Sequence, residues 1–225
     1  NSIKDTGYDV DNSLRFNDGS SDSLNRTPSG DGNKRTFTFS TWLKISTIKE
    51  HMFFTCGVYS STSLMQFYLN ANGTLTMSQE NSSGSIQSTL TTTQVFRDTS
   101  AWYHFVIAID TTQGTDSNRV KLYVNGSQVT SFSTSTYPSQ NLDFACNTSS
   151  VINTIGNRSG GSFYFDGYMA EIILVDGSQL APTSFGETDS VTNNWVPKDV
   201  SGLTFGTNGF YLDFKDSSAL GNDVS

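Results

Sequence analysis

The carboxylates are the side chains best suited to acid–base chemistry, and glutamates are few. The chain contains only Glu50, Glu80, Glu171 and Glu187. Cleavage of a glycosidic bond needs two carboxyl groups facing one site, about 5–9.5 Å apart. Glu171 and Asp176 form the best local pair, but an offset of five along a strand places side chains on opposite faces. We therefore expect an exposed Glu171, a turn at Asp176, and no enzyme activity; a glycoside hydrolase, with carboxylates converging from separate strands, is the least favoured alternative.

Nucleophilic catalysis would have to use one of two histidines, His51 and His104. The chain has no Gly-x-Ser-x-Gly turn that would hold a serine beside such a base. His104 shares one strand face with Trp102 and Val106, so we expect it to be packed and hydrogen-bonded. Zinc-ligand spacings and phosphate-binding glycine loops are absent from the sequence. The glycines at residues 30–35 are therefore expected to belong to a turn.

Short strands must position these side chains, because no segment shows a helical period of 3.6 residues. Asn125-Gly126 and Asn72-Gly73 follow alternating runs and predict hairpins, the first returning as far as Phe132. One helical turn is expected near residues 181–185. Strands are predicted at 13–16, 36–45, 52–58, 64–69, 75–77, 86–92, 102–110, 120–124, 151–155, 163–175 and 210–214. Long polar loops are expected at 18–35 and 133–150, and the whole pattern predicts two packed antiparallel sheets or a barrel.

Composition limits the partners of this domain. Ser, Thr, Asn and Gly make up 99 of 225 residues, and 13 basic against 21 acidic residues give a net charge of −8. A nucleic acid would be repelled by this charge. The longest apolar run, residues 105–109, is far shorter than the roughly 18 residues of a membrane helix, and residues 1–5 lack the apolar stretch of a secretory signal. Cys56 and Cys146 are too few for a disulfide framework, so we expect free thiols.

Several segments, taken in order, resemble the laminin G and pentraxin branch of the concanavalin A-like lectin/glucanase superfamily. They are Trp102-Tyr-His104, Val120-Lys-Leu-Tyr-Val-Asn-Gly126, Ile155-Gly-Asn157 and Phe165-Asp-Gly-Tyr-Met-Ala-Glu-Ile-Ile-Leu-Val175. The resemblance covers about residues 13–185 and implies an all-β fold, a jelly-roll sandwich of two antiparallel sheets. We expect one domain over residues 1–225, with 186–225 packing on this core, as part of a longer chain.

The same resemblance implies calcium, which needs several converging oxygen ligands. In the pentraxin pattern, an Asp-Asn pair follows the strand matching 52–58, and a Glu-Gln-Asp cluster follows the strand matching 151–156. Here these places read Tyr59-Ser-Ser-Thr62 and Asn157-Arg158-Ser159, so the carboxylates are missing and Arg158 brings a cation. We expect no metal and no cofactor. Calcium in the loop of Asp18, Asp22 and Asp31 is the alternative to ordinary acidic turns.

A second set of segments resembles sequences that recur in large tail and virion proteins of bacteriophages. The set comprises Ser13-Leu-Arg-Phe-Asn17, Leu24-Asn-Arg-Thr-Pro28, Thr38-Phe-Ser-Thr-Trp42, Phe185-Gly-Glu-Thr-Asp189, Trp195-Val-Pro-Lys198 and Asn208-Gly-Phe-Tyr-Leu-Asp-Phe214. This resemblance implies a module of a virion protein, located in the virion or outside the cell. Other virion proteins would then be partners, and the parent protein could be a homo-oligomer.

A sugar site needs planar polar side chains beside an exposed aromatic ring. Tyr59, Tyr137, Asn157, Arg158 and Tyr164 lie at predicted loop edges and are the candidate carbohydrate-binding residues. Trp195 is expected instead to pin the C-terminal segment to the sandwich. The leading hypothesis is a noncatalytic, lectin-like module that contacts a host-surface glycan, with no membrane insertion. The alternative is a structural or decoration module for protein–protein packing in the particle.

Overall fold

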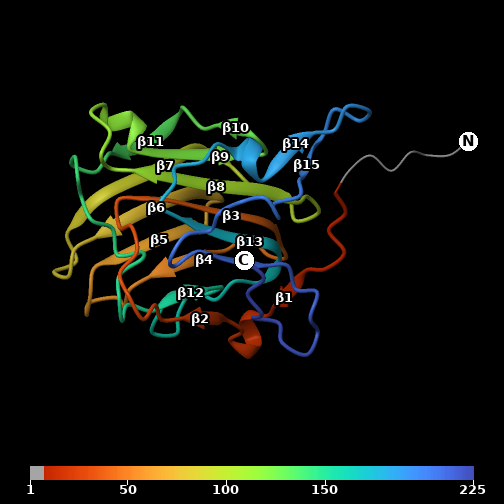
Figure 1. Ribbon diagram of the computed structural model, residues 1–225, viewed down its shortest axis with the longest axis horizontal. Coiled ribbons are helices and arrows are strands. Elements are labelled where there is room, and N and C mark those ends of the chain that lie inside the picture. Colours follow the sequence, from red (N-terminus) through yellow and green to blue (C-terminus); the bar gives the residue numbers. More distant parts are fainter. Residues whose placement is uncertain (1–7) are drawn as a thin grey trace, which may run out of the picture.

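The computed structural model describes residues 8–225, so the N-terminal residues considered above for a secretory signal lie outside it. Two seven-stranded sheets form a sandwich, and in Figure 1 the two layers overlap, with the strands of each sheet following one another from the top of the view to the bottom. Sheet A has the order β1 (Leu14–Phe16), β13 (Gly167–Asp176), β3 (Thr36–Ile45), β8 (Tyr103–Asp110), β9 (Val120–Val124), β10 (Ser127–Gln128), with β16 (Phe210–Leu212) also pairing with β13. Sheet B has the order β11 (Phe132–Thr136), β7 (Ile86–Val95), β6 (Thr74–Glu80), β5 (Leu64–Leu69), β4 (His51–Cys56), β12 (Asn153–Ile155), β2 (Leu24–Arg26). The predicted all-β jelly-roll sandwich is confirmed.

The strands with clear alternation lie where the sequence predicts them. β3 has the predicted bounds, and β8 and β9 meet antiparallel with Ile107 opposite Leu122. The turn after β9 places both Asn125 and Gly126 at positive φ, 47° and 79°, as a two-residue hairpin of this type requires. A single 3₁₀ turn at Pro182–Ser184 agrees with the expected helical turn.

The predicted hairpin partner of β9 is wrong beyond Gln128. β10 spans only Ser127–Gln128, and the chain then leaves sheet A to form β11, which pairs with β7 in sheet B. The loop expected at 133–150 therefore begins with a strand. Three further strands were not predicted: β2, β14 (Gly186–Thr188) and β15 (Trp195–Pro197). These three strands have only three residues each, too few to show a periodicity, and pairing with other strands orders them.

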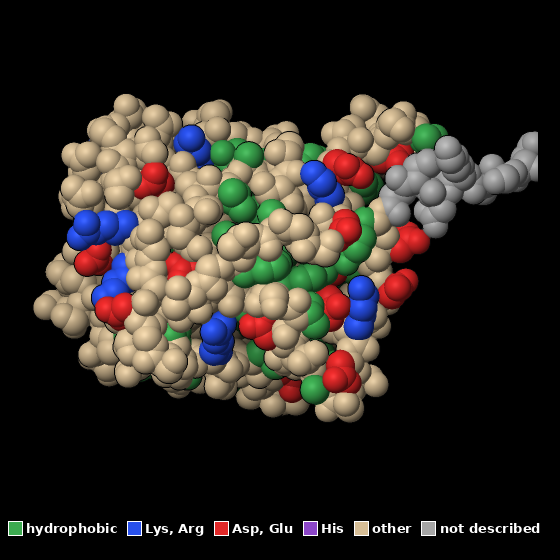
Figure 2. All heavy atoms as spheres, viewed as in Figure 1, with side chains coloured by type: hydrophobic (Ala, Val, Ile, Leu, Met, Phe, Trp, Pro, Cys, Tyr) green, Lys and Arg blue, Asp and Glu red, His purple; other side chains and the backbone are tan. Residues whose placement is uncertain are grey.

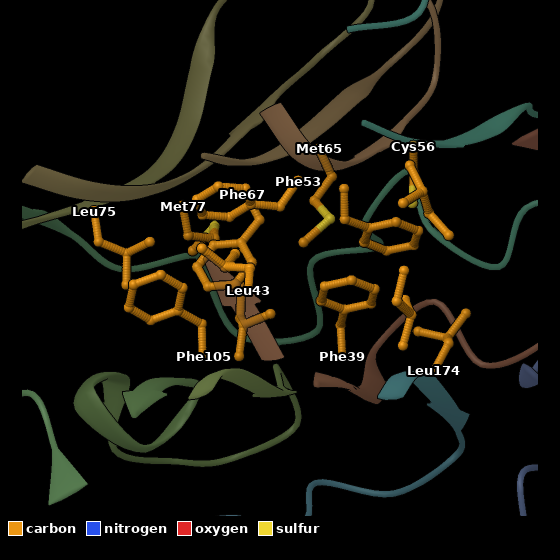
Figure 3. Packing of buried hydrophobic residues seen from close by; sticks show 14 of the residues in the cluster. Phe39, Leu43, Phe53, Cys56, Met65, Phe67, Leu75, Met77, Phe105 and Leu174 are labelled. Carbon is orange, nitrogen blue, oxygen red and sulfur yellow. The ribbon is translucent and has the colours of Figure 1, made fainter. Parts of the chain in front are cut away.

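The core between the sheets is built mainly from phenylalanines. Phe39 of sheet A stacks on Phe54 of sheet B with ring centres 4.3 Å apart, and Phe53 stacks on Phe105 at 5.7 Å. Figure 3 shows the rings of Phe39, Phe53 and Phe105 among leucine and methionine side chains from the two facing sheets. Burial of so much apolar surface is the main stabilising contribution to such a sandwich.

A second, smaller apolar cluster lies on the outer face of sheet A. Val106, Ile173 and Val175 project there and are covered by Phe185 and Val200, which come after β13 in the chain. Leu180, Leu203 and Phe205 pack against the same cluster. The outer face of sheet A is therefore the one on which the C-terminal part of the chain lies. Within the described residues no helix has the length and apolar character needed to cross a membrane.

Both cysteines are free and fully buried, as expected. Burial raises the pKa of the Cys56 thiol, and the neighbouring Cys146 raises it further. Because the thiolate is the reactive form, we expect no reaction with a thiol reagent in the native protein and two reactive thiols after denaturation without reductant. Titration with a chromogenic disulfide reagent measures both values. Fewer than two thiols in the denatured protein would show a bridge and contradict the structure.

Candidate functional site

Two carboxylates of β13, Glu171 in the middle and Asp176 at the end, do not face a common site. Glu171 lies in a bulge where the pairing with β3 shifts, with φ at 49°, and it is 4% exposed. The expectation of an exposed Glu171 is therefore wrong, because the bulge turns the side chain toward the cover of sheet A. Its Oε2 accepts a hydrogen bond of 2.6 Å from the hydroxyl of Tyr211, and that hydroxyl lies 2.9 Å from the hydroxyl of Tyr8. Burial raises the pKa of Glu171, against the opposing effect of the hydrogen bond from Tyr211.

Asp176 ties three loops together. Its Oδ1 accepts from the backbone N–H of Asn33 at 2.8 Å and from Asn147 Nδ2 at 3.0 Å, and its Oδ2 accepts from the backbone N–H of Asn208 at 3.0 Å. All of these are structural bonds within the protein. Glu171 and Asp176 thus have separate surroundings, in agreement with the prediction that they form no catalytic dyad.

His104 has the hydrogen-bonded, packed role that the sequence predicts. The Trp195 indole N–H donates to His104 Nδ1 at 2.9 Å, and Nε2 lies 2.8 Å from Ser40 Oγ. An indole N–H can only donate, so Nδ1 is an acceptor and the neutral ring carries its proton on Nε2. Nε2–H therefore donates to Ser40 and cannot take the proton of that hydroxyl. The Ser40–His104 contact does not have the protonation state of a nucleophile and its base.

Trp195 fixes β15 against sheet A, as expected for a residue that pins the C-terminal segment. Its ring covers the β9–β10 turn so closely that a Cβ at Gly126 would lie 2.5 Å from Trp195 Cε3. Gly126 also has φ at 79°, a conformation that is costly for any residue with a side chain. Glycine is thus required at this turn both by the backbone and by the tryptophan.

Replacing Gly126 with alanine should lower the free energy of unfolding by about 2–4 kcal/mol, from the left-handed backbone and the clash with the ring. Thermal unfolding followed by circular dichroism measures the loss. Gly114→Ala is the matched control, because a Cβ at Gly114 meets nothing within 4 Å and its φ is not positive. Equal stability of the two variants would refute the proposed packing of Trp195.

Each carboxylate of the acidic loop has its own partner. Asp18 pairs with Lys49, Asp22 accepts from the backbone N–H of Asn17 at 2.9 Å, and Asp31 pairs with Lys34 at 2.8 Å. Asp31 also accepts from the backbone N–H of Ser149 at 2.7 Å. In residues 8–225 no three His, Cys, Asp or Glu side chains gather as a metal-ligand group.

Two of the five predicted sugar-binding residues meet at one place, which we call the arginine stack: Arg158 between Tyr59 and Phe163. The Arg158 guanidinium carbon lies 4.6 Å from the ring centre of Tyr59 and 4.3 Å from that of Phe163. Both rings are exposed. Burial raises the pKa values of Glu50 and Glu80, and the nearby charge of Arg158 opposes the shift in each. The loops after β4 and β12 thus hold a fixed cation beside two carboxylates.

The other three predicted residues have different surroundings. Asn157 precedes the stack, but it is 6% exposed and its Oδ1 has no hydrogen-bond partner among the described residues. Tyr164 is half-buried, with its hydroxyl over Gly161. Tyr137 packs against the inter-sheet core and lines a separate hollow with Gln128 and Phe132. The structure therefore does not bring Tyr137 to the arginine stack.

The residues at the place where the resemblance implies calcium do not fit that ion. The loop that begins with Tyr59 carries no carboxylate, and Arg158 is held there by two rings. A fixed guanidinium repels a divalent cation, and its hydrogen-bonding groups are all donors. No calcium chemistry is derived for this protein.

All three tryptophans of the chain line one pocket, on the outer face of sheet A. Ala170 and Trp42 lie on the paired strands β13 and β3, and Trp102 directly precedes the next strand, β8. Trp195, Val196 and Pro197 of β15 line another side. The pocket has a volume of about 370 Å³. Figure 2 shows hydrophobic side chains extending toward the end of the molecule where β15 and the segment before β1 lie in Figure 1.

The three rings play different parts in this tryptophan pocket. Trp42 is 8% exposed and stacks on His104, with ring centres 4.7 Å apart. Its indole N–H is buried and has no hydrogen-bond partner in the part of the chain that the structure describes. Trp102 is 40% exposed and so presents a free ring. Asp11, Asn12 and Ser13 add a carboxylate, an amide and a hydroxyl to the lining.

A sandwich of two antiparallel sheets in this arrangement is the fold of the concanavalin A-like lectins and glucanases. The chain belongs to the concanavalin A-like lectin/glucanases superfamily, whose laminin G family matches residues 18–181. The predicted membership is thereby confirmed. No curated protein gives a significant match to the chain.

Solved structures share the fold at low sequence identity. A heptameric SAP-like pentraxin from Limulus polyphemus is 14% identical with a TM-score of 0.51, covering 80% of this chain and 91% of its own. Domains LG4-5 of the mouse laminin α1 chain are 11% identical with a TM-score of 0.52, over 78% of this chain and 44% of that one. The enzymatically active domain of tailspike protein 2 from bacteriophage CBA120 is 15% identical with a TM-score of 0.50, over 76% of this chain and 26% of that one. At these identities the likeness concerns the fold.

Proposed function

We propose that this protein is a noncatalytic glycan-binding module and that the tryptophan pocket is its sugar site. The observation that carries the proposal is the convergence of Trp42, Trp102 and Trp195 on one pocket. The sequence places them far apart, and sheet A with its β15 cover brings them together. An aromatic wall with polar groups on the opposite side is the arrangement that a pyranose ring, with its apolar face and hydroxyl edge, requires.

In this proposal the sugar stacks on the exposed ring of Trp102. Asp11 and Asn12 are well placed to bind hydroxyls, since no described side chain bonds to them. The lining contains Asp11 and no lysine or arginine, so we expect a neutral sugar rather than a sialic or uronic acid.

The setting we propose is a bacteriophage virion, in a tail or fibre protein whose module contacts a glycan on the host surface. The segments that resemble phage tail and virion proteins support it. Other virion proteins would be partners, a homo-oligomeric parent would present several copies, and the location would be the virion or outside the cell. A multivalent arrangement of this kind would strengthen weak single-site binding.

Two alternatives remain in the proposal. A structural module would use the same apolar pocket to hold a side chain of a neighbouring virion protein. A glycan could instead contact the arginine stack, where Tyr59, Arg158 and Tyr164 would be the binding residues. Glycoside hydrolysis has the least support, because Glu171 and Asp176 have structural partners and no pair of carboxylates is arranged as acid and nucleophile at the tryptophan pocket.

A glycan array of neutral and acidic glycans, probed with the purified module with and without calcium, tests the proposal. We expect selective binding to neutral glycans that does not change on chelation. Failure of folded protein to bind any glycan on the array or on host polysaccharide would refute the glycan-binding function and favour the structural module. Binding that disappears on chelation would contradict the site assigned here.

A further inference from the structure

A second pocket opens between the two sheets, at an edge of the sandwich. It lies at the sheet edge formed by β2 and β12, beside β16 and the end of the chain. Phe54, Ile155, Phe210 and Leu212 give it an apolar lining. Its volume is about 110 Å³, so it has room for a small chemical group rather than for a whole sugar ring.

Asn153 lines this pocket, and its buried side-chain amide makes no hydrogen bond within the described residues. It is 4% exposed, and neither its Oδ1 nor its Nδ2 has a hydrogen-bond partner among the described residues. Buried polar atoms are nearly always hydrogen-bonded, because an unmade bond costs about 1–3 kcal/mol. Asn153 leaves two such atoms unpaired, a donor and an acceptor side by side.

The pairing of β12 determines on which face of the sheet the Asn153 side chain lies. Its neighbours in register are Cys56 on β4 and Arg26 on β2, so its backbone is paired on both sides. Asn153 shares a face with Ile155, which belongs to the inter-sheet core. An apolar side chain would be usual at that position. Because the amide has no partner among the described residues, we expect a polar group from outside the protein to bind it.

We propose that this pocket binds the acetamido group of an N-acetylated sugar. An acetamido group offers an acceptor C=O and a donor N–H, which match Asn153 Nδ2 and Oδ1, and a methyl group for the apolar lining. The two polar atoms of Asn153 are covered in the free protein, so binding requires the amide to rotate toward the pocket. The acetamido group has four non-hydrogen atoms, and the pocket has the space of about three to four water molecules at roughly 30 Å³ each. The group therefore fits in size as well as in chemistry.

The rim of the pocket favours a sugar over an acetylated lysine as the bearer of that group. Arg26 Nη1 lies 3.8 Å from Asp223 Oδ2, and Arg26 is held by a hydrogen bond of 3.0 Å to the carbonyl of Gly209. Asp223 is held in turn by the backbone N–H of Tyr211 at 3.0 Å. A fixed guanidinium and a fixed carboxylate suit the hydroxyls of a sugar ring, whereas a lysine arm is apolar. This second site does not depend on the tryptophan pocket, since the two share no lining residue.

The test is a titration of ¹⁵N-labelled protein with methyl N-acetyl-β-glucosaminide, methyl β-glucoside and N-acetyl-lysine amide. The NMR signal of the Asn153 side-chain amide reports binding at this pocket. We expect the N-acetylated sugar to shift it with an affinity at least about tenfold higher than the glucoside, a difference of about 1.4 kcal/mol. Equal affinities, or no shift at millimolar sugar, would overturn the proposal and show that the pocket holds water only. A response to acetyl-lysine amide alone would overturn the sugar assignment.

Asn153→Leu is the matched variant, because it keeps the size of the side chain and removes both polar atoms. We expect it to abolish the preference for the acetamido group, measured in this variant from the backbone amide signals of Thr154 and Ile155 on the same strand. The protein should stay folded, as judged by its backbone NMR spectrum. Trp102→Ala separates the two sites: it should leave the response of Asn153 unchanged. Loss of that response in Trp102→Ala would contradict independent sites, whereas failure of glycan binding at the tryptophan pocket alone would leave the Asn153 result standing.

Discussion

Trp102→Ala should reduce glycan affinity roughly 30-fold and leave the thermal unfolding temperature nearly unchanged. Trp102 is the exposed ring of the tryptophan pocket, so its removal takes away the stacking surface without opening the core. Aromatic anchors in binding pockets commonly contribute about 2 kcal/mol or more, which corresponds to the expected loss. Isothermal titration with the best glycan from the array gives the affinity, and circular dichroism gives the unfolding temperature.

Tyr59→Ala is the control for this experiment. Tyr59 is 52% exposed and stacks on Arg158, so its loss removes a comparable surface ring at the arginine stack. We expect the Tyr59 variant to bind like the natural sequence. The reverse result, with binding lost in Tyr59→Ala and kept in Trp102→Ala, would move the sugar site to the arginine stack and refute the tryptophan pocket.

Long strands with regular alternation were predictable from the sequence, whereas several of the shortest pairings were not. In β3, Phe37, Phe39, Leu43 and Ile45 belong to the core cluster, and their period of two fixes the strand and its faces. β2 has only three residues, was not predicted, and exists because it pairs with β12, which is distant in the sequence. No local pattern marks such strands, since the free energy that orders them comes from partners distant in sequence.

The tryptophan pocket was missed for the same reason. Its lining comes from the segment before β1, from β3, β13 and β15, and from the start of β8, and only the folded sheet places these together. One signal was available: Trp42 stands in the outward phase of β3, between core residues Thr41 and Leu43, where a polar residue is usual. The arginine stack was easier to find, because Tyr59 and Arg158 lie in loops that follow neighbouring strands, β4 and β12.

His104 should make the protein markedly less stable in mild acid. Burial lowers the pKa of His104 from 6.5 to about 3, so the ring stays neutral in the native state over a range in which the unfolded chain is protonated. The unfolded state then binds the additional proton, and the free energy of unfolding falls as the pH falls. Above pH 6.5 the titration of His104 leaves the free energy of unfolding unchanged. Below pH 6.5 that free energy decreases by about 1.4 kcal/mol per pH unit until the native pKa is reached.

Urea unfolding at pH 7 and pH 5 measures this effect before most carboxylates titrate, and about 2 kcal/mol of stability should be lost from His104 over that interval. His104→Gln removes the titrating group, so its pH dependence should be shallower by about that amount, whatever its stability at pH 7. His51→Gln is the companion variant, because burial also lowers the pKa of His51. Since Nδ1 of His104 accepts from Trp195 and Nε2 donates to Ser40, protonation would turn the acceptor nitrogen into a second donor facing an indole N–H. Acid should therefore release β15 and disturb the tryptophan pocket; a pH dependence unchanged by His104→Gln would refute this coupling.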